Sequence, residues 1–253
     1  MIGMFETACG IPIPAVTAAQ MREVDRIAID ETGPNLYQMM ENAGRSLATL
    51  VMDLLGSAWH HAEIVVLAGT GGNGGGGICA ARHLANRGAA VTLCLAAPLR
   101  LSSVTDWQYA FYRSTGGHEI TASTLPASPA LIVDALIGYS LSGAPRGVFE
   151  ALILWTNNAN AQVLSLDIPS GVDASTGAVY GSAVRATATL TLALPKVGLA
   201  SDRAGSLWLA DIGIPAETYR RAGITFSWPS SPKFVVPLRT SAESPDRPLS
   251  PEP

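Results

Sequence analysis

The sequence predicts an α/β fold in which a mostly parallel sheet lies between layers of helices. Short apolar runs alternate with helical patterns along most of the 253 residues. Several runs, such as 64–68 and 91–95, are apolar almost throughout, as strands covered on both faces require. Three runs also end in turns that carry polar side chains, at 69–77, 133–138 and 166–173. Because ligands bind beyond the carboxyl ends of parallel strands, these turns indicate one polar site, and hence an α/β enzyme.

Two helices are expected before the sheet begins. The first covers 17–31, because Thr17 can cap its amino end and apolar residues follow at helical spacing. A Gly-Pro pair at 33–34 ends this helix. A second helix with a broad apolar face follows over 35–55.

The next elements alternate between strand and helix up to the strand at 162–167, and no helical pattern is seen between the last two strands. Those two strands are therefore expected to pair antiparallel at one edge of the sheet. We expect strands at 63–68, 90–96, 130–135, 162–167, 187–193 and 206–211, and helices at about 75–87, 104–115 and 146–157.

The length fits one large domain, predicted over 1–225. A chain that is 48% hydrophobic and 14% charged can bury a sizeable single core. Composition changes toward the end, where seven of the 17 prolines lie within 229–253. Such a segment buries too little apolar surface to offset its ordering entropy, so 226–253 is predicted to be a disordered tail.

The net charge and the cysteine content limit the kinds of partner and the cellular location that are expected. The net charge of −4 offers no Lys/Arg excess for a phosphate backbone, so nucleic acid is not expected. Three cysteines without a C-x-x-C pair indicate neither a disulfide framework nor a zinc site. No signal-peptide pattern and no run of eighteen apolar residues is found, so no membrane association and a cytoplasmic location are expected.

The glycine-rich turn at 69–77 contains a G-x-G-x-x-G pattern, but a bound nicotinamide cofactor is disfavoured. A dinucleotide fold needs an acidic residue about twenty positions on, and none lies between Glu63 and Asp106. The turn also lacks the Gly-Lys-Ser/Thr of a phosphate loop. Its backbone N–H groups at a helix start suit an anion, and the alternative is a merely flexible connector.

Three oxygen-bearing residues follow strands at the other turns. Asp134 ends an apolar run and must be paired or metal-bound if it is buried, although it could instead be a turn or capping residue. Asp167 ends a strand, and Pro169 forces a turn that would hold it rigidly. Ser170 lacks the G-x-S-x-G context and a His partner of a nucleophile. Together with Asn73, these residues form a hard-oxygen set suited to an alkali or alkaline-earth cation.

Four stretches then carry a family resemblance: TAAQMREVDRIAIDE with MENAG, the glycine-rich turn with GICAARHLANRG, VDALIGYSLSG, and LSLDIPSGVDASTG with LALPKVGL and LADIGIP. Over roughly 15–222 the chain resembles the YjeF N-terminal domain family, the NAD(P)H-hydrate epimerases. The resemblance implies a three-layer α/β/α Rossmann-like sandwich, a homodimer, and K⁺ held by Asn73, Asp134 and Ser170. The implied substrate contacts are Gly72, Asn73, Gly74, Gly75, Gly76, Gly138, Tyr139, Ser140, Leu141, Ser142, Gly143, Ala144 and Asp167.

The chain departs from the family pattern at two positions of the glycine-rich turn. The family's G-x-G-N-N-G-G-D-G has Gly72 here for its first Asn and Gly76 for its Asp. The loop is therefore expected to have lost an amide and a carboxylate from the substrate side. The dehydratase domain that follows in many family members is not in this chain, so a dehydratase would act in trans.

The leading interpretation is epimerisation of R and S NAD(P)H hydrate, a small-molecule substrate hydroxylated on the reduced nicotinamide ring. The ring nitrogen expels the hydroxyl, and water returns on either face, with Asp167 as acid/base. K⁺ would orient polar groups of the substrate. Two alternatives stay open: an enzyme of the same fold that acts on another small molecule in a biosynthetic pathway, and a catalytically silent ligand-binding or scaffold domain. The loss at Gly72 and Gly76 predicts a poor epimerase that Gly72→Asn with Gly76→Asp would improve.

A homodimer is predicted from the resemblance and from the helix at 36–54. This helix has more large apolar residues than one core-facing stripe needs, namely Met39, Met40, Leu47 and Leu50.

Overall fold

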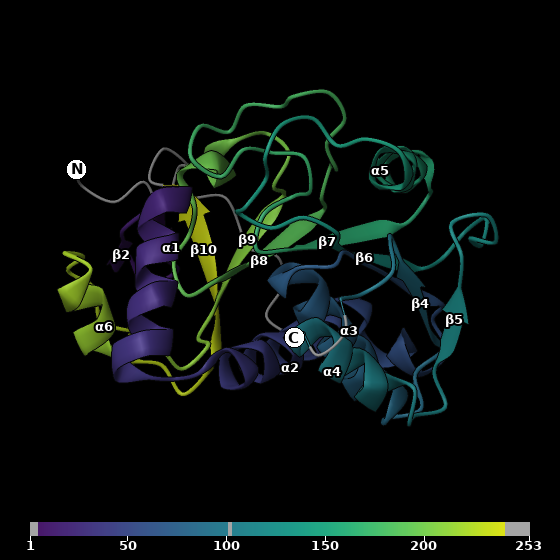
Figure 1. The fold of residues 1–253 in the computed structure, drawn as a ribbon, viewed down its shortest axis with the longest axis horizontal. Helices are drawn as coiled ribbons and strands as arrows, with labels where there is room; N and C mark the ends of the chain where they lie inside the picture. Colours follow the sequence, from purple (N-terminus) through teal and green to yellow (C-terminus); the bar gives the residue numbers. More distant parts are fainter. Residues whose placement is uncertain (1–4, 101–102, 241–253) are drawn as a thin grey trace.

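A computed structural model describes residues 5–100 and 103–240, and a single ten-stranded sheet runs through it in the order β2-β1-β10-β9-β8-β7-β6-β3-β4-β5 (Figure 1). The strands are β1 Phe5–Thr7, β2 Pro12–Ile13, β3 Ile64–Ala68, β4 Val91–Leu95, β5 His118–Ile120, β6 Leu131–Ala135, β7 Gln162–Leu166, β8 Ala188–Leu192, β9 Ser206–Ala210 and β10 Val235–Thr240. The α-helices are α1 Ala18–Ile27, α2 Leu36–Leu55, α3 Gly72–Ala85, α4 Val104–Tyr112, α5 Val148–Asn158 and α6 Ala216–Arg221, with short π and 3₁₀ turns at Ala28–Thr32, Gly56–His60 and Val197–Ala200.

The predicted three-layer α/β/α architecture is confirmed. Strand β3 shows why the sheet is apolar throughout, because all five of its residues are buried. Ile64 and Val66 pack in the core beneath α2 and α3, whereas Val65 and Leu67 pack in the core beneath α5. In Figure 1, α5 lies on one face of the sheet and α2, α3 and α4 on the other.

The first two helices begin where the sequence predicts. Thr17 and Asn35 each accept a hydrogen bond from the backbone N–H three residues on, and the side-chain oxygen of the Gln at that position accepts one from the backbone N–H of the cap residue. Such reciprocal caps satisfy helix-start donors that have no partner within the helix. The helix α3 starts at Gly72, three residues earlier than predicted, directly after β3.

The pairing expected for the last two predicted strands is wrong. Strands β8 and β9 are parallel, from Ala188 opposite Ser206 to Leu192 opposite Ala210. The crossover between them is made by loop and the short turn Val197–Ala200 instead of an α-helix. A parallel connection therefore occurs here without the helical signature on which the prediction relied.

The prediction of a disordered tail from 226 onward is also wrong over 226–240. The strand β10 lies between β9 and β1 and pairs antiparallel with both. Val236 and Leu238 are buried, and the Phe226 ring packs edge-on against Tyr219 at 5.0 Å between centroids. The alternating pattern of this short strand was overlooked because the segment is rich in proline and because one of its two partner strands, β1, comes from the other end of the chain. Residues 241–253 of the predicted tail lie outside the described residues.

The apolar excess of α2 does not support a dimer. Met39, Met40, Leu47 and Leu50 are all buried inside the protomer, at 5%, 4%, 0% and 1% exposure. Leu47 and Leu50 pack in the core that α2 shares with α3 and the sheet, whereas Met39 packs in the core that also contains residues of α1, and these two directions of packing explain the width of the stripe. The homodimer stays a prediction from the resemblance. No helix among the described residues is long and apolar enough to cross a membrane, and the expected location stays a prediction.

Candidate active site

A cavity of about 690 Å³ opens at the carboxyl ends of β3, β6 and β7. The chain leaves β3 on one side to β4 and later returns on its other side to β6, so the cavity lies at the topological switch point. Most of the residues that line it come from α1, α2, the start of α3, and the strand ends and loops after β6, β7 and β8. The predicted convergence of the three strand-end turns is thereby confirmed.

Asp167 follows β7 and is held in a left-handed backbone conformation, with φ of 70°. That conformation is uncommon for a non-glycine residue, and here it turns the chain sharply at the strand end. The carboxylate Oδ1 accepts hydrogen bonds from Lys196 Nζ and, at 3.3 Å, from Leu192 N. Oδ2 has no hydrogen-bond partner within the described parts of the chain. One oxygen is therefore fixed while the other is available to a ligand.

Lys196 is the buried partner of Asp167. The two side chains are 1% and 4% exposed, and Nζ also donates to Leu192 O at 2.9 Å. Removing one member of such a pair leaves an uncompensated buried charge, which is strongly unfavourable. Sequence reasoning missed this residue as part of the site. The available signal was that Lys196 is the single charged residue over 188–200.

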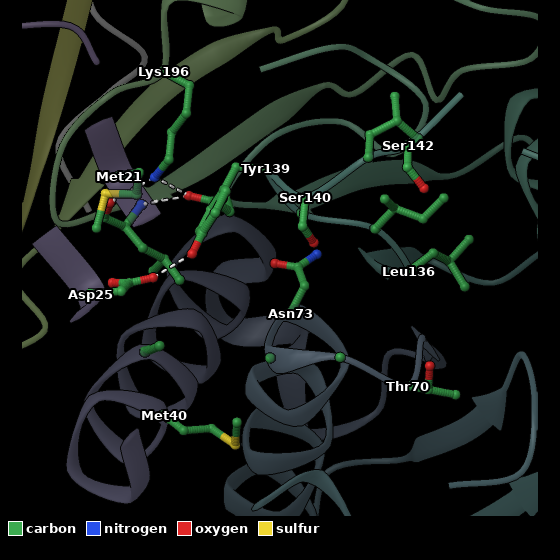
Figure 2. Close-up of a pocket in the computed structure, with 18 of the residues that line it drawn as sticks. Met21, Asp25, Met40, Thr70, Asn73, Leu136, Tyr139, Ser140, Ser142 and Lys196 are labelled. Atoms are coloured by element: carbon green, nitrogen blue, oxygen red, sulfur yellow. Dashed lines mark hydrogen bonds and ion pairs between the residues drawn. The ribbon is translucent and has the colours of Figure 1, made fainter. Parts of the chain in front are cut away.

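A second carboxyl group enters the cavity from α1. The Tyr139 hydroxyl donates a short hydrogen bond to Asp25 Oδ2, toward which it points in Figure 2. Burial raises the pKa of Asp25, although the bond from Tyr139 and the charge of Lys196 partly oppose the shift. Burial and the neighbouring Asp25 also raise the pKa of Tyr139. Lys196 Nζ lies 5.9 Å from the centroid of the Tyr139 ring, so the two pairs are adjacent.

Asp134 and Ser170 are in direct contact beneath the cavity. Asp134 is fully buried, and its carboxylate accepts bonds from Ser170 Oγ at 2.5 Å, Ser170 N at 2.9 Å and Ser165 Oγ at 2.8 Å. Burial raises its pKa despite these hydrogen bonds. No Lys or Arg pairs with it among the described residues. The carboxylate is thus hydrogen-bonded and lacks a cationic partner from the protein.

Asn73 lines the same region from the first turn of α3. Its Nδ2 is buried with no hydrogen-bond partner in the part of the chain that the structure describes. A Cβ at Gly138 would lie 3.2 Å from Asn73 Cγ, so glycine keeps this space open. The preceding residue, Ile137, donates its N–H to Ser170 Oγ at 2.8 Å. Asp134 and Ser170 are therefore in direct contact, and Asn73 lies against the segment after β6 that also contacts Ser170.

The glycine-rich turn divides into two functionally different halves. Gly72 and Asn73 line the cavity, and a Cβ at Gly72 would meet nothing within 4 Å. In contrast, Gly74, Gly75 and Gly76 are buried and do not line it. A Cβ at Gly76 would lie 2.8 Å from Leu166 Cδ2, inside the contact between α3 and the sheet. The expectation that residue 76 faces the substrate is therefore wrong, because α3 begins early and turns this position inward.

The loop after β6 forms the opposite wall, as the sequence predicts. All seven residues from Gly138 to Ala144 line the cavity, and Arg146 follows them at its edge. Arg146 is exposed and makes no ion pair within the described ranges.

Comparison with known proteins agrees with this arrangement. The sequence profile described as YjeF-related protein N-terminus matches residues 36–198, more than half of the chain. The chain belongs to this family. A protein of Dehalogenimonas lykanthroporepellens named NAD(P)H-hydrate epimerase is 50% identical over 94% of this chain and 98% of its own length. A Weissella koreensis protein of the same name is 35% identical over 81% of this chain and 95% of its own.

Longer relatives contain the same domain in a larger protein. The bifunctional NAD(P)H-hydrate repair enzyme Nnr of Salinibacter ruber is 38% identical over 83% of this chain, which spans only 42% of that enzyme. A crystal structure of a yeast protein, ynu0 (YNL200c), superposes with a TM-score of 0.78 and 20% identity. It covers 89% of this chain and 100% of its own, which shows that the two share the YjeF N-terminal fold.

A separate polar cluster lies between α2 and α3 of this YjeF-related domain. Glu41, Cys79 and His83 bring their ligand atoms within 4.8 Å of one another. The guanidinium of Arg82 already contacts this group, with Nη2 2.6 Å from Glu41 Oε2 and 3.4 Å from Cys79 Sγ. Burial raises the pKa of Cys79 to about 12, so the thiol keeps its proton. The cluster acts as an interhelical ion pair.

Proposed function

We propose that this protein is an NAD(P)H-hydrate epimerase that interconverts the R and S forms of hydrated NADH or NADPH. The observation that carries the proposal is the buried Asp167–Lys196 pair, which places one free carboxylate oxygen in a cavity at the switch point. A cavity of about 690 Å³ is within the usual range for a small-molecule site. The name of the relative that is 50% identical over nearly the whole chain supports the same activity.

The chemistry requires little beyond proton transfer. The lone pair of the ring nitrogen forms a double bond to the carbon that bears the hydroxyl, and the carbon–oxygen bond breaks. A proton from the enzyme makes the departing group water. Water then adds to the planar cation, and a carboxylate accepts the proton that it loses. Asp167 is suited to accept that proton, while Lys196 fixes the orientation of its carboxylate.

K⁺ is proposed as the resident cation, held by Asn73, Asp134 and Ser170. These residues fit it chemically: they supply an amide, a carboxylate and a hydroxyl, and the fully buried Asp134 has no protein cation beside it among the described residues. When bound, K⁺ would offset the charge of Asp134 and polarise nearby oxygen ligands. A titration with KCl against NaCl, comparing wild type with Asn73→Ala, tests the assignment. Equal activity in both salts contradicts it.

The other partners are proposals too. The substrate is a small molecule, and a dehydratase in another chain would act on the same hydrate, because the longer relatives are named as bifunctional NAD(P)H-hydrate repair enzymes. Homodimer formation is testable by the mass from light scattering. An alternative substrate or a catalytically silent domain is less well supported, since Asp167, Lys196 and the loop over 138–144 all line one cavity.

The test uses purified protein with S and R forms of hydrated NADH in separate reactions. The two epimers are followed by chromatography against the spontaneous rate. The proposal predicts accelerated interconversion from both directions to the same final ratio. Rates equal to the spontaneous reaction for both NADH and NADPH hydrates would overturn it.

A further inference from the structure

The cavity holds two carboxyl groups that come from different elements. Among the described residues that line it, Asp25 and Asp167 are the two that carry carboxylates. Asp167 is at the end of β7, and Asp25 is on α1. Each has one oxygen held by a neighbour, namely Tyr139 for Asp25 and Lys196 for Asp167. Their other oxygens have no hydrogen-bond partner in the described parts of the chain.

Epimerisation needs proton transfer on both faces of the ring. The hydroxyl departs from one face, and water must return on the opposite face for the configuration to invert. Asp167 presents one oxygen to a ligand, because Lys196 and Leu192 N hold the other and the backbone adopts φ of 70°, so it is suited to one face of a bound ring. A second acid/base group in the same cavity would remove this restriction.

We propose that Asp25 is a second catalytic carboxyl, so that each face of the ring has its own acid/base group. This inference rests on the proposed epimerase function and extends it. Tyr139 is the positioning residue, because its hydroxyl donates to Asp25 and its ring lies beside Lys196.

The surroundings of Asp25 suit a proton donor. Burial raises its pKa above the usual value for Asp, which increases the protonated fraction near neutral pH. The charged and titratable groups that act on it are Tyr139 and Lys196, which oppose the shift, and Asp167, which adds to it. Asp167, in contrast, is paired with an ammonium group and is suited to accept a proton. The two carboxyls therefore occupy complementary environments.

In the proposed step, Asp25 gives its proton to the hydroxyl as the carbon–oxygen bond breaks, and the nitrogen lone pair becomes the second bond to that carbon. Water on the other face forms a new carbon–oxygen bond, the electron pair returns to nitrogen, and Asp167 takes the released proton. The reverse epimerisation uses the same groups in opposite roles. Exchange with solvent returns both carboxyls to their starting states.

The test follows the oxygen atom as well as the configuration. Each pure epimer carries ¹⁸O in its ring hydroxyl, and loss of label and inversion are measured together for wild type, Asp25→Asn and Asp167→Asn. Each variant should epimerise a hundredfold or more slowly. Each should still exchange label without inversion in one epimer, because the remaining carboxyl can protonate the hydroxyl and then deprotonate water on the same face. The surviving epimer should be opposite for the two variants.

Three further variants test whether the role of Asp25 is merely structural. Glu23→Gln removes an exposed carboxylate from the same helix, outside the cavity, and should behave as wild type. Asp25→Glu should restore part of the epimerisation that Asp25→Asn loses. Tyr139→Phe should slow inversion less than Asp25→Asn does. Its loss of label exchange should affect the same epimer as in Asp25→Asn.

The outcomes separate the two proposals. If wild type neither inverts nor exchanges the label, the epimerase function itself fails, and this inference with it. If wild type is active, the inference is overturned when Asp25→Asn inverts at the wild-type rate. It is also overturned when that variant, still folded by thermal unfolding, loses exchange equally in both epimers or is not improved by Asp25→Glu.

Discussion

At the scale of single residues, the Asp167–Lys196 pair couples activity to stability. Both side chains are almost completely buried, so each compensates the charge of the other. Replacing Asp167 by Asn should lower epimerisation a hundredfold or more. It should also lower the free energy of unfolding by about 3–5 kcal/mol, because Lys196 is left unpaired. Turnover and urea unfolding on the same preparation measure both effects.

A double variant separates the two roles. Lys196→Met alone should destabilise the fold to a similar extent, by leaving Asp167 unpaired. Asp167→Asn with Lys196→Met should recover much of the stability, since no buried charge is left, but none of the activity. Additive losses of stability in the double variant would show that the two side chains do not interact.

The glycines of the turn at 69–77 give a second prediction. Gly76→Asp should destabilise by about 1–3 kcal/mol, mainly because its carboxylate would be buried without a partner, whereas the end of the Leu166 side chain can move to admit the Cβ that would lie 2.8 Å from its Cδ2. Gly72→Asn should fold normally, since its side chain would enter open space at the cavity. Thermal unfolding of the two variants, with Gly76→Ala as a steric control, tests this difference. The activity gain predicted from the sequence for the combined change is not expected from position 76.

At the scale of elements, the residues at the strand ends could be predicted from the sequence, but the direction in which a helical residue faces could not. Asp134 lies at the carboxyl end of β6, and Asp167 and Ser170 follow β7, so their convergence followed from the parallel pairing of these two strands. Asp25 belongs to an amphipathic helix far away in the sequence, and nothing in its local pattern distinguishes it from the exposed acids beside it. Gly76 could not be placed, because the direction of a helical residue depends on where the helix starts and what it packs against.

The contact between α2 and α3 predicts a pH-dependent stability. Burial alone would raise the pKa of Glu41, but the hydrogen bonds from Arg82 and His83 outweigh it and lower the pKa. A carboxylate with a lowered pKa stabilises the fold above its unfolded pKa, and the contribution is lost as pH falls through the folded value. Because Glu41 is 37% exposed, solvent screening reduces the expected contribution to about 1 kcal/mol.

The comparison of Glu41→Gln with wild type measures this contribution. The variant should be less stable at pH 7.5, and the difference should shrink as pH is lowered toward 4. Glu63→Gln, which changes an exposed carboxylate without an ion pair among the described residues, serves as the control. A difference that is constant over this range would mean that the interaction does not depend on the charge of Glu41.

At the scale of the whole molecule, the sheet consists of two parts with different roles. The parallel strands from β9 to β5 carry the cavity, whereas β2, β1 and β10 form an antiparallel edge from segments near both ends of the chain. The Arg239 side chain reinforces this edge by donating to Glu6 at 2.6 Å. The parallel part could be predicted from apolar runs, but the edge could not, because its partners are more than 220 residues apart.

The edge should contribute to stability and not to catalysis. Leu238 is 4% exposed and belongs to the same core cluster as Phe5 and Leu207, so Leu238→Ala should lower the free energy of unfolding by about 2–4 kcal/mol. Pro237, its half-buried neighbour on the opposite face of the strand, offers the matched control as Pro237→Ala. Because the cavity residues lie on other strands, kcat and KM for epimerisation should be unchanged in both variants at a temperature where both are folded. A single cooperative unfolding transition in Leu238→Ala would show that the edge and the parallel strands fold as one unit. Two separate transitions would contradict that view, because the edge would then unfold independently of the parallel strands. A loss of activity in folded Leu238→Ala would contradict the separation from catalysis and would assign β10 a role in the active site.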